Sequence, residues 1–561
     1  MEYLIFLVAL IVILLLLFLK GLYEYRREQQ KFRNLLHTNY GKKLECDYPP
    51  EYFRHISRFS QKHPGEFTID EITWHDLNMD EVFKQMNYTY SSAGEEYLYY
   101  LLRNPALKED DLSHLEEVIR FFDAHKEDRE ELQYIFSRLG KIKKFSIYDY
   151  LDYLDELGER SNRKHYLAFL LMGASICLMA VNFSVGILAF LAVLIYNNIT
   201  YFGIKKEIEP YITSFSYIFR LTDTFKELNR HRMDCLSKEF EEMEPVACRL
   251  SKIRRGSAIV MNSSQIGGNG NPLDILMNFL KMWFHIDLIR FNQMLADVKA
   301  HRDDVDLLLT DYGLIESCIA IGEYRTYVGR FCVPSFHNEK RLKMTNGYHP
   351  LLTNPVGNSF ETKKGMLITG SNASGKSTFL KTVAINALLA QSIHTCLADE
   401  FQTPFFRICS SMSLQDDVLK GESYYMVEIK SIKRILDLVA DGKEPVLCLV
   451  DEVLRGTNTV ERIAASSQIL KALNTESSMC FAATHDVELT GLLEEYYDNY
   501  HFSEEVSNGD VSFSYRLQPG KATTRNAIRL LEIMGFQEDI IQKAEEMAAG
   551  FTDSSCWQML D

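Results

Sequence analysis

The chain begins with an uninterrupted run of apolar residues. Every residue from Tyr3 to Leu19 is apolar, and with residues 20–23 the run makes a helix of about 20 residues, close to the length that crosses a bilayer. A cleaved signal peptide is the alternative, although the first residues supply no basic start and residues 20–24 lack a small-residue cleavage pattern. Four basic residues follow the run, namely Arg26, Arg27, Lys31 and Arg33. The positive-inside rule therefore predicts a transmembrane anchor over residues 1–23, with the N-terminus outside and the rest of the chain in the cytoplasm.

A second apolar stretch, residues 166–199, lies far inside the chain. No charged residue occurs between Lys164 and Lys205, and the turn-like segment 182–186 divides the stretch into two halves. Basic residues flank both ends, so both ends are expected in the cytoplasm, which a two-pass hairpin satisfies. The alternative is a buried helix pair in a soluble core, because each half is short for a membrane span and the stretch contains Asn182, Asn197 and Asn198. The pattern favours a membrane hairpin.

The rest of the chain divides into a helical part and a part with strands. Over residues 110–159 and 205–321 apolar residues recur at three- and four-residue spacing among charged ones, which predicts long amphipathic helices. The segment 263–272 is the clearest loop. Later, short apolar runs at 366–369, 445–450 and 479–483 are typical of buried strands, and helical patterns separate them. We expect a juxtamembrane linker over 24–66, an all-α core over 67–335 that contains the hairpin, a C-terminal α/β domain over 336–551 and a tail over 552–561.

Composition limits the classes of function. The 561 residues include 61 Lys and Arg against 77 Asp and Glu, a net charge of −16, so the chain does not coat nucleic acid by charge alone. Any contact with DNA has to be local. The 11 cysteines contain no CxxC pair, which fits reduced thiols in a cytoplasmic body.

The apolar run at 366–369 leads directly into a phosphate-binding sequence. This sequence has the GxxxxGK[ST] pattern between a strand and a helix, and its residues are Gly370, Ser371, Asn372, Ala373, Ser374, Gly375, Lys376, Ser377 and Thr378. The glycines let backbone N–H groups turn towards phosphates, Lys376 is expected to reach the β- and γ-phosphates, and Ser377 is expected to hold Mg²⁺. The motif predicts that the chain binds ATP with Mg²⁺.

Two further strand ends carry residues suited to ATP hydrolysis. The run at 445–450 ends in Asp451 and Glu452, where Asp451 is expected to ligate Mg²⁺ and Glu452 to act as general base on the attacking water. The run at 479–483 leads to His485, which is placed to sense the γ-phosphate. Each of these residues alone would more often be a surface or structural group. Downstream of a phosphate loop, they together predict a Mg²⁺-dependent ATPase.

Four ordered motifs resemble the ATPase domain of the MutS family of DNA mismatch repair proteins. They are the phosphate loop, Asp417 with the segment Gly421–Glu428, Leu449–Thr459 and Ala482–His485. Segments 347–350, 68–77 and 92–105 are similar to the region before the family's ATPase strand and to the start of its helical core. The resemblance implies that Asn372, Lys376, Ser377 and Thr378 bind nucleotide and Mg²⁺, while Asp451, Glu452 and His485 assist hydrolysis. It also implies a C-terminal P-loop ATPase of the ABC and MutS type.

The resemblance also implies a homodimer. In the family the serine at the place of Ser423 is offered across the dimer to the partner's γ-phosphate, which would give two composite ATP sites. The same serine would also serve as the N-cap of a helix that starts at Tyr424, and the two roles are compatible. The closing helices over 523–551 resemble the family's dimer-bracing segment.

These observations predict a multidomain, membrane-anchored MutS-like ATPase that works as a dimeric ATP switch related to DNA mismatch repair or to binding of mismatched or branched DNA. It would be a multi-pass protein of the cell membrane with its ATPase domain in the cytoplasm. The linker over 24–66 leaves no room for a mismatch-reading domain, and no nuclease domain is expected after the ATPase. The alternative is an ATP-driven membrane motor or transport-associated ATPase that does not bind DNA. The adenine pocket is expected around residues 349–360.

Overall fold

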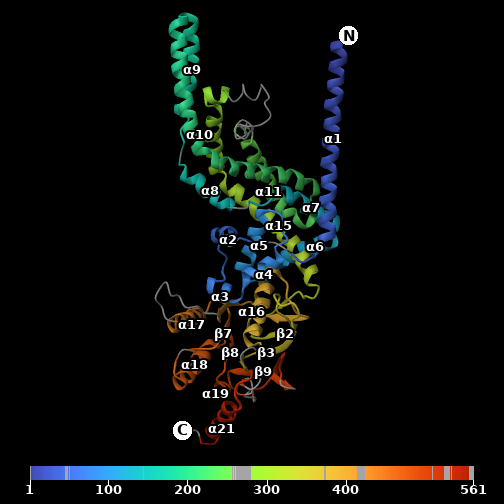
Figure 1. Cartoon of the computed structure of the whole chain (residues 1–561), viewed down its shortest axis with the longest axis vertical. Helices are drawn as coiled ribbons and strands as arrows, with labels where there is room; N and C mark the ends of the chain where they lie inside the picture. The colour runs from blue at the N-terminus through green and yellow to red at the C-terminus, as the bar shows by residue number, and fades with distance from the viewer. Residues whose placement is uncertain are drawn as a thin grey trace. The chain divides into compact units, whose positions relative to one another are not determined.

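The computed structural model describes most of the chain. The described residues are 2–44, 48–49, 51–142, 145–158, 160–254, 257, 260, 279–371, 374–412, 424–455, 457–507, 510–522, 528, 531 and 534–554. They cluster into two compact units (Figure 1). The helical unit consists of Met1–His63, Asn87–Tyr100 and Glu117–Glu323, and the sheet unit consists of Pro64–Met86, Leu101–Glu116 and Tyr324–Asp561. The predicted loop 263–272 lies outside the described residues.

Only helices precede the first strand in the described chain. In order they are α1 (Glu2–Asn39), α2 (Tyr52–Lys62), α3 (Glu71–Asp76), α4 (Met79–Met86), α5 (Ser92–Arg103), α6 (Glu109–Ala124), α7 (Lys126–Leu139), α8 (Ile147–Glu156), α9 (Arg163–Val181), α10 (Phe183–Leu228), the 3₁₀ turns η1 (Asn229–His231) and η2 (Asp234–Leu236), α11 (Ser237–Ile253), α14 (Ile286–Ala300) and α15 (Arg302–Val328). Buried aromatic rings fill the core of the helical unit. Phe136 of α7 meets Tyr312 of α15, and Phe215 of α10 meets Phe291 of α14.

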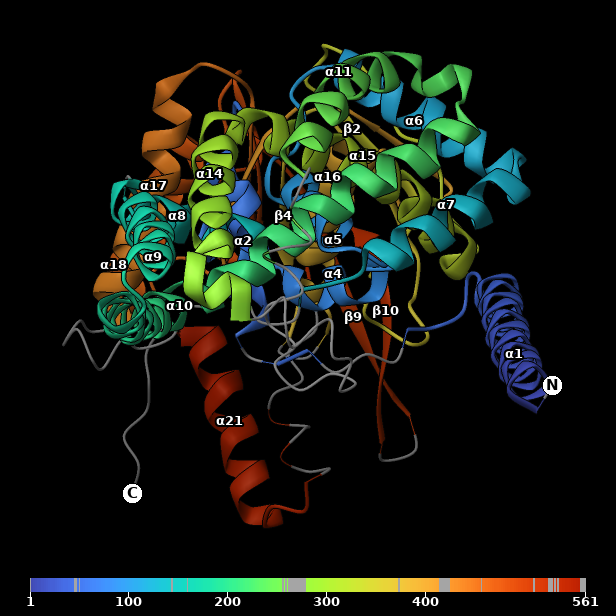
Figure 2. The same ribbon diagram turned by 90° about the horizontal axis from the view of Figure 1, so that it is seen from above.

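The predicted hairpin is a pair of adjacent helices, α9 and α10 (Figures 1 and 2). Asn182 joins them in an extended conformation, and its side chain caps α10 by accepting a hydrogen bond from the backbone N–H of Val185 at 3.2 Å. A Cβ at Gly186 would lie 2.4 Å from the backbone of Met179, so this tight approach requires glycine. The second helix does not end near Ile199 as the apolar run does, but continues to Leu228, because polar residues continue the helical pattern without a break.

Few residues are buried in the apolar part of this pair, residues 163–208. Two segments, Arg163–Val181 and Phe183–Ile208, are long and apolar enough to cross a membrane, and only 22% and 11% of their apolar windows are buried. A helix pair in a soluble core would be mostly buried. These are the two segments of this kind within the part of the chain that the structure describes. The first predicted anchor is helical within α1, and most of its apolar side chains lie outside the described set.

The sheet unit contains two sheets. Its strands are β1 (Ser335–Phe336), β2 (Leu342–Gly347), β3 (Asn358–Thr362), β4 (Gly365–Thr369), β5 (Glu400–Thr403), β6 (Arg407–Ser411), β7 (Val446–Asp451), β8 (Ser478–Ala483), β9 (Tyr497–Ser507) and β10 (Asp510–Pro519). The larger sheet has the order β10-β9-β4-β8-β7-β6, and all neighbours in it are parallel except the hairpin of β9 and β10. The smaller has the order β1-β5-β2-β3.

Helices cover the larger sheet on both faces. They are α16 (Lys376–Ile393), α17 (Tyr424–Asp441), α18 (Thr459–Leu473) and α19 (Glu488–Leu492), and one more helix, α21 (Glu538–Ser554), follows near the end of the chain. Val446, Cys448 and Val450 of β7 belong to one apolar cluster with α17, α18 and α19. Because side chains alternate along a strand, Asp451 at the end of β7 points to the opposite face, towards α16. This α/β arrangement agrees with the C-terminal fold expected from the sequence.

Candidate nucleotide site

The register of the parallel strands brings three predicted site segments to one edge of the sheet. Ala483 of β8 pairs with Ile368 of β4 on one side and with Asp451 of β7 on the other. The backbone continues this row, since Thr484 donates to Ile368 at 3.0 Å and Glu452 donates to Ala483 at 2.9 Å. Ligands of open α/β folds bind at such carboxyl ends. The phosphate loop, the acidic pair and the histidine therefore meet through strand pairing between segments distant in sequence.

The phosphate loop depends on two glycines with positive φ. Gly370 has a φ of 145°, and a Cβ there would lie 2.9 Å from the carbonyl oxygen of Phe502. Gly375 has a φ of 106° and immediately precedes α16. The Lys376 ammonium group donates to the carbonyl oxygens of Gly370 at 2.7 Å and Ser371 at 2.8 Å. The loop therefore curls around the lysine that the sequence assigned to phosphate binding.

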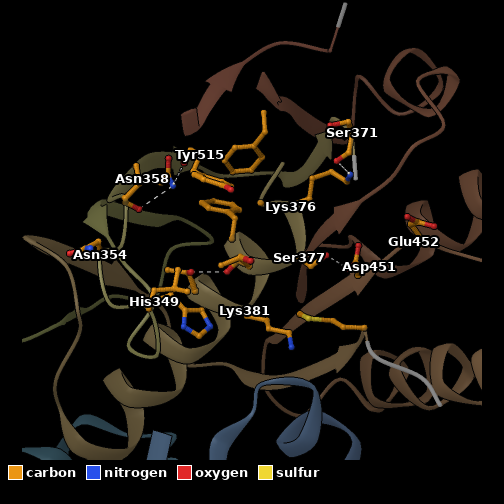
Figure 3. Close-up of a pocket in the computed structure, with 18 of the residues that line it drawn as sticks. His349, Asn354, Asn358, Ser371, Lys376, Ser377, Lys381, Asp451, Glu452 and Tyr515 are labelled. Carbon is orange, nitrogen blue, oxygen red and sulfur yellow. Dashed lines mark hydrogen bonds between the residues drawn. The ribbon is translucent and has the colours of Figure 1, made fainter. Parts of the chain in front are cut away.

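The first residue after that lysine faces the acidic pair. Ser377 Oγ donates to Asp451 Oδ2 at 2.5 Å, drawn as a dashed line in Figure 3. Hydroxyl and carboxylate oxygens are the ligands that Mg²⁺ prefers, and Mg²⁺ usually takes only one or two of them from a protein. Among the described residues, no cluster of three or more His, Cys, Asp and Glu side chains could hold a metal by itself. Two oxygen donors beside a phosphate loop fit a metal shared with phosphate oxygens.

The neighbouring carboxylate, Glu452, is part of a charged network. Its oxygens lie 3.0 Å from His485 Nε2 and 2.7 Å from Arg455 Nε, and His485 Nε2 lies 3.4 Å from the Lys376 ammonium group. Burial raises the pKa of Glu452, but the hydrogen bond with His485 and the charges of Arg455 and Lys376 bring this pKa below its ordinary value. The Glu452 backbone has a φ of 61°, an unfavourable conformation for this residue type. The network holds Glu452 as a carboxylate at the mouth of the loop.

These residues line one cavity of about 790 Å³ (Figure 3). Its opposite wall comes from residues 349–358 and from Tyr515 of β10, where the strand register shifts between Phe513 and Leu517. Asn358 fixes this wall by donating to the Tyr515 carbonyl at 3.1 Å and accepting from the Leu517 N–H at 2.8 Å. The Tyr515 ring reaches the phosphate loop, since a Cβ on Gly375 would lie 3.2 Å from it.

The structure places most, but not all, of the predicted site residues. Lys376, Ser377, Asp451, Glu452 and His485 come together as described above. The others that line or form the loop are Gly370, Ser371, Ser374, Gly375 and Thr378. Asn372, Ala373 and Ser423 lie outside the described residues.

Several groups at the cavity were not singled out from the sequence. The sequence could have indicated Arg455, because this residue lies within the motif Leu449–Thr459, from which only Asp451 and Glu452 were predicted as site residues. Lys381 follows Ser377 by one helical turn and therefore lies on the same face of α16. Apart from this spacing, nothing in the sequence indicates that Lys381 lines the cavity. Tyr515 had none, because its position depends on a positive φ in an irregular strand.

A phosphate loop after a parallel strand, with an acidic pair at the end of another, defines the P-loop nucleotide-binding class. Residues 366–552 match the family model of MutS domain V. The DNA mismatch repair protein MutS of Roseiflexus sp. (strain RS-1) is 32% identical over 236 residues, which are 39% of this chain and 22% of that protein. MutS of Pseudothermotoga lettingae is 35% identical over 225 residues, or 38% and 27% of the two chains. MutS of Chloroflexus aurantiacus (strain J-10-fl) is 29% identical over 281 residues, or 47% and 29%.

The chain thus spans less than a third of the length of these curated relatives. The matching family model covers the larger sheet and its helices. These findings support the MutS relationship inferred from the four motifs, at the level of the ATPase domain.

Proposed function

We propose that the chain is a Mg²⁺-dependent ATPase related to the MutS family, anchored in a membrane and working as a dimeric switch. The observation that supports this most is that Lys376, Ser377, Asp451 and Glu452 line one cavity together with residues of the phosphate loop. His485 contacts Lys376 and Glu452 beside them. The match to MutS domain V covers all of these residues.

In this proposal each residue of the site has a separate task. The loop N–H groups and Lys376 bind the phosphates, with Lys376 exchanging its two carbonyl partners for phosphate oxygens. Ser377 and Asp451 would hold Mg²⁺, which would supply positive charge to neutralise the phosphate oxygens. Glu452 takes a proton from the attacking water, since its carboxyl group stays ionised at neutral pH. His485 contacts both Glu452 and Lys376, so it orients the Glu452 carboxylate and would sense the γ-phosphate.

Two substitutions separate binding from hydrolysis. Lys376→Ala should weaken ATP binding, whereas Glu452→Gln should keep binding and slow hydrolysis by about 10²–10⁴, because only the general base is lost. Binding of a fluorescent ATP analogue and phosphate release measure the two steps. Glu494→Gln, an exposed carboxylate in the same unit, is the matched control. Undiminished hydrolysis by Glu452→Gln would refute the assignment of the base.

The dimer is proposed from the family resemblance at Ser423. If Ser423 acts on the partner's nucleotide, a Lys376→Ala subunit and a Ser423→Ala subunit should each be inactive as homodimers. Mixing them should restore one intact site per heterodimer. Heterodimers that form but recover no activity would contradict the role in trans.

A location in the cell membrane is proposed from the predicted anchor over residues 1–23 and from the low burial of the apolar segments 163–181 and 183–208. Cysteine labelling should find positions near Arg160 and Lys205 in the cytoplasm, and Ser184 outside or within the bilayer. A chain without residues 2–20 should stay bound to membranes through the hairpin. If that chain is soluble and monodisperse without detergent, the hairpin is not a membrane element.

The partner of the switch is proposed to be DNA, because the relatives are DNA mismatch repair proteins by name. The exposed hairpin favours a second candidate, an ATP-driven membrane motor that binds no DNA. A pull-down with mismatched and branched duplexes at physiological salt, with and without ATP, distinguishes the two.

A further inference from the structure

A short helix from early in the chain covers the free edge of the larger sheet. β6 is the last strand of that sheet, and its outer edge faces α3 within the sheet unit. The backbone N–H of Ser410 donates to Thr73 Oγ1 at 3.1 Å. Asp76 Oδ2 accepts from Ser410 Oγ at 2.7 Å and from the backbone N–H of Met412 at 2.9 Å. Side chains of α3 therefore take the place of a neighbouring strand for β6.

Further contacts hold α3 in this position. Asp70 caps α3 by accepting from the backbone N–H of Thr73 at 2.8 Å, and it forms an ion pair with Arg434 of α17. Asp76 is only 2% exposed, so its carboxylate is held between α3 and the end of β6. Burying a carboxylate is unfavourable unless it is hydrogen-bonded, and the two bonds from β6 supply that compensation.

The same carboxylate acts on the nucleotide cavity. Met412, whose N–H it holds, lines the cavity, and so does Lys381, which lies one turn after Ser377 on α16 (Figure 3). The half-buried Lys381 ammonium forms no ion pair among the described residues, and the negative charges of Asp76 and Asp451 both attract it. Lys381 is therefore shared electrostatically between Asp76 and the proposed metal ligand.

We propose that Asp76 is a positioning residue of the nucleotide site, which fixes the end of β6 and draws Lys381 away from Asp451. This inference rests on the proposed ATPase function. Without the charge of Asp76, Asp451 is the remaining carboxylate among the described residues that attracts Lys381, and the ammonium group then competes there with a divalent cation. The early segment that contains α3 thereby sets the affinity of the site for Mg²⁺.

The test separates the charge of Asp76 from its hydrogen bonds. In Asp76→Asn the amide oxygen can accept the same two bonds, so the structure of β6 is kept while the charge is lost. The Mg²⁺ concentration for half-maximal hydrolysis should rise about three- to tenfold, the size expected of one electrostatic coupling, while KM for ATP at saturating Mg²⁺ changes little. The midpoint of Mn²⁺ binding in the presence of ATP, followed by electron paramagnetic resonance, should shift by the same factor without reference to turnover.

A second substitution makes the inference specific to Lys381. In Asp76→Asn/Lys381→Met the competing cation is gone, so the Mn²⁺ midpoint should return to the wild-type value or below it. Lys381→Met alone should leave the midpoint unchanged or lower it. Glu71→Gln removes one charge from the same helix at a 72% exposed position and serves as the control, with no shift expected.

Three results would overturn the inference: an unchanged Mn²⁺ midpoint in folded Asp76→Asn, a shift that persists in the double variant, or a higher midpoint in Lys381→Met. The last of these keeps the test decisive even if Asp76→Asn does not fold. A wild-type chain that binds no ATP analogue would instead refute the proposed function, so the two failures are distinguishable.

Discussion

Acid should destabilise the sheet unit through a buried imidazole, that of His349 in the wall of the cavity. His349 is 7% exposed, and its Nδ1 accepts a hydrogen bond from the backbone N–H of Leu351 at 3.2 Å, which requires a neutral ring. Burial, together with the charge of Lys381, lowers the pKa of His349 from 6.5 to about 4.

The sign and size follow from linkage. Because the pKa is lower in the folded state than in the unfolded chain, the contribution of His349 to stability is complete above pH 6.5 and is lost as the pH falls towards 4. Between pH 7.5 and 5 the free energy of unfolding should fall by about 2 kcal/mol on account of this group, and well below pH 4 by at most about 3 kcal/mol.

The variant His349→Asn removes the titrating imidazole but can keep the hydrogen bond from the backbone N–H of Leu351. An asparagine oxygen can accept from the N–H two residues on, as Nδ1 of His349 does. Native-state hydrogen exchange in peptides of α16, measured on the full chain, gives the free energy of opening at pH 7.5 and at pH 5. This free energy should fall between the two pH values in both proteins, and the fall should be about 2 kcal/mol smaller in the variant than in the wild type. The exposed His75→Asn is the control, and its pH dependence should match the wild type. Equal pH dependence in wild type and His349→Asn would show that the ring titrates normally or that its protonation does not oppose folding.

Three further substitutions probe the packing and the loops of the site. Gly365→Ala should cost about 1–3 kcal/mol of stability, because its Cβ would lie 2.6 Å from a core tyrosine ring, whereas Gly491→Ala, with no atom within 4 Å, should melt like the wild type; equal melting of both variants would contradict this. Asn358→Ala should weaken binding of an ATP analogue about tenfold, because it releases the part of β10 where the register shifts, beside the phosphate loop; unchanged affinity in titrations would exclude a role for that wall of the cavity. Arg462→Ala should slow phosphate release about tenfold and leave ATP binding intact, since Arg462 holds the loop after β8 by two bonds to Asp486, of 2.9 and 2.6 Å; an equal loss of binding would instead indicate general disorder.

The parts of the site that sequence predicted are those built from local patterns. A glycine-rich loop between an apolar run and a helix can be recognised from the sequence alone, and so can an acidic pair at the end of a strand. Both are patterns of residues that are adjacent in the sequence. The structure has β4, α16, β7 and β8 at those places. That these strand ends lie together follows from the general rule for parallel sheets.

The parts that sequence missed depend on contacts between distant segments. Asp76 lies 334 residues from Ser410, and no periodicity in either segment indicates that α3 covers β6. Tyr515 reaches the phosphate loop through a register shift and a φ of 52°, which propensity does not favour. The length of α10 was missed for a different reason, since the end of an apolar run is not the end of a helix.

The sheet unit is assembled from three separate segments of the chain, and this affects how it folds during synthesis. Ribosomes extend a chain at about 5–20 residues per second, so roughly 20–70 s pass between the synthesis of Asp76 and of its partner Ser410, 334 residues later. During that time the segments 163–181 and 183–208 emerge, and α3 has no strand to cover. When β6 does emerge, its open edge can pair with any other strand until α3 reaches it. A fragment that starts near residue 324 would lack α3 permanently, and we expect it to associate through β6 where the full chain does not.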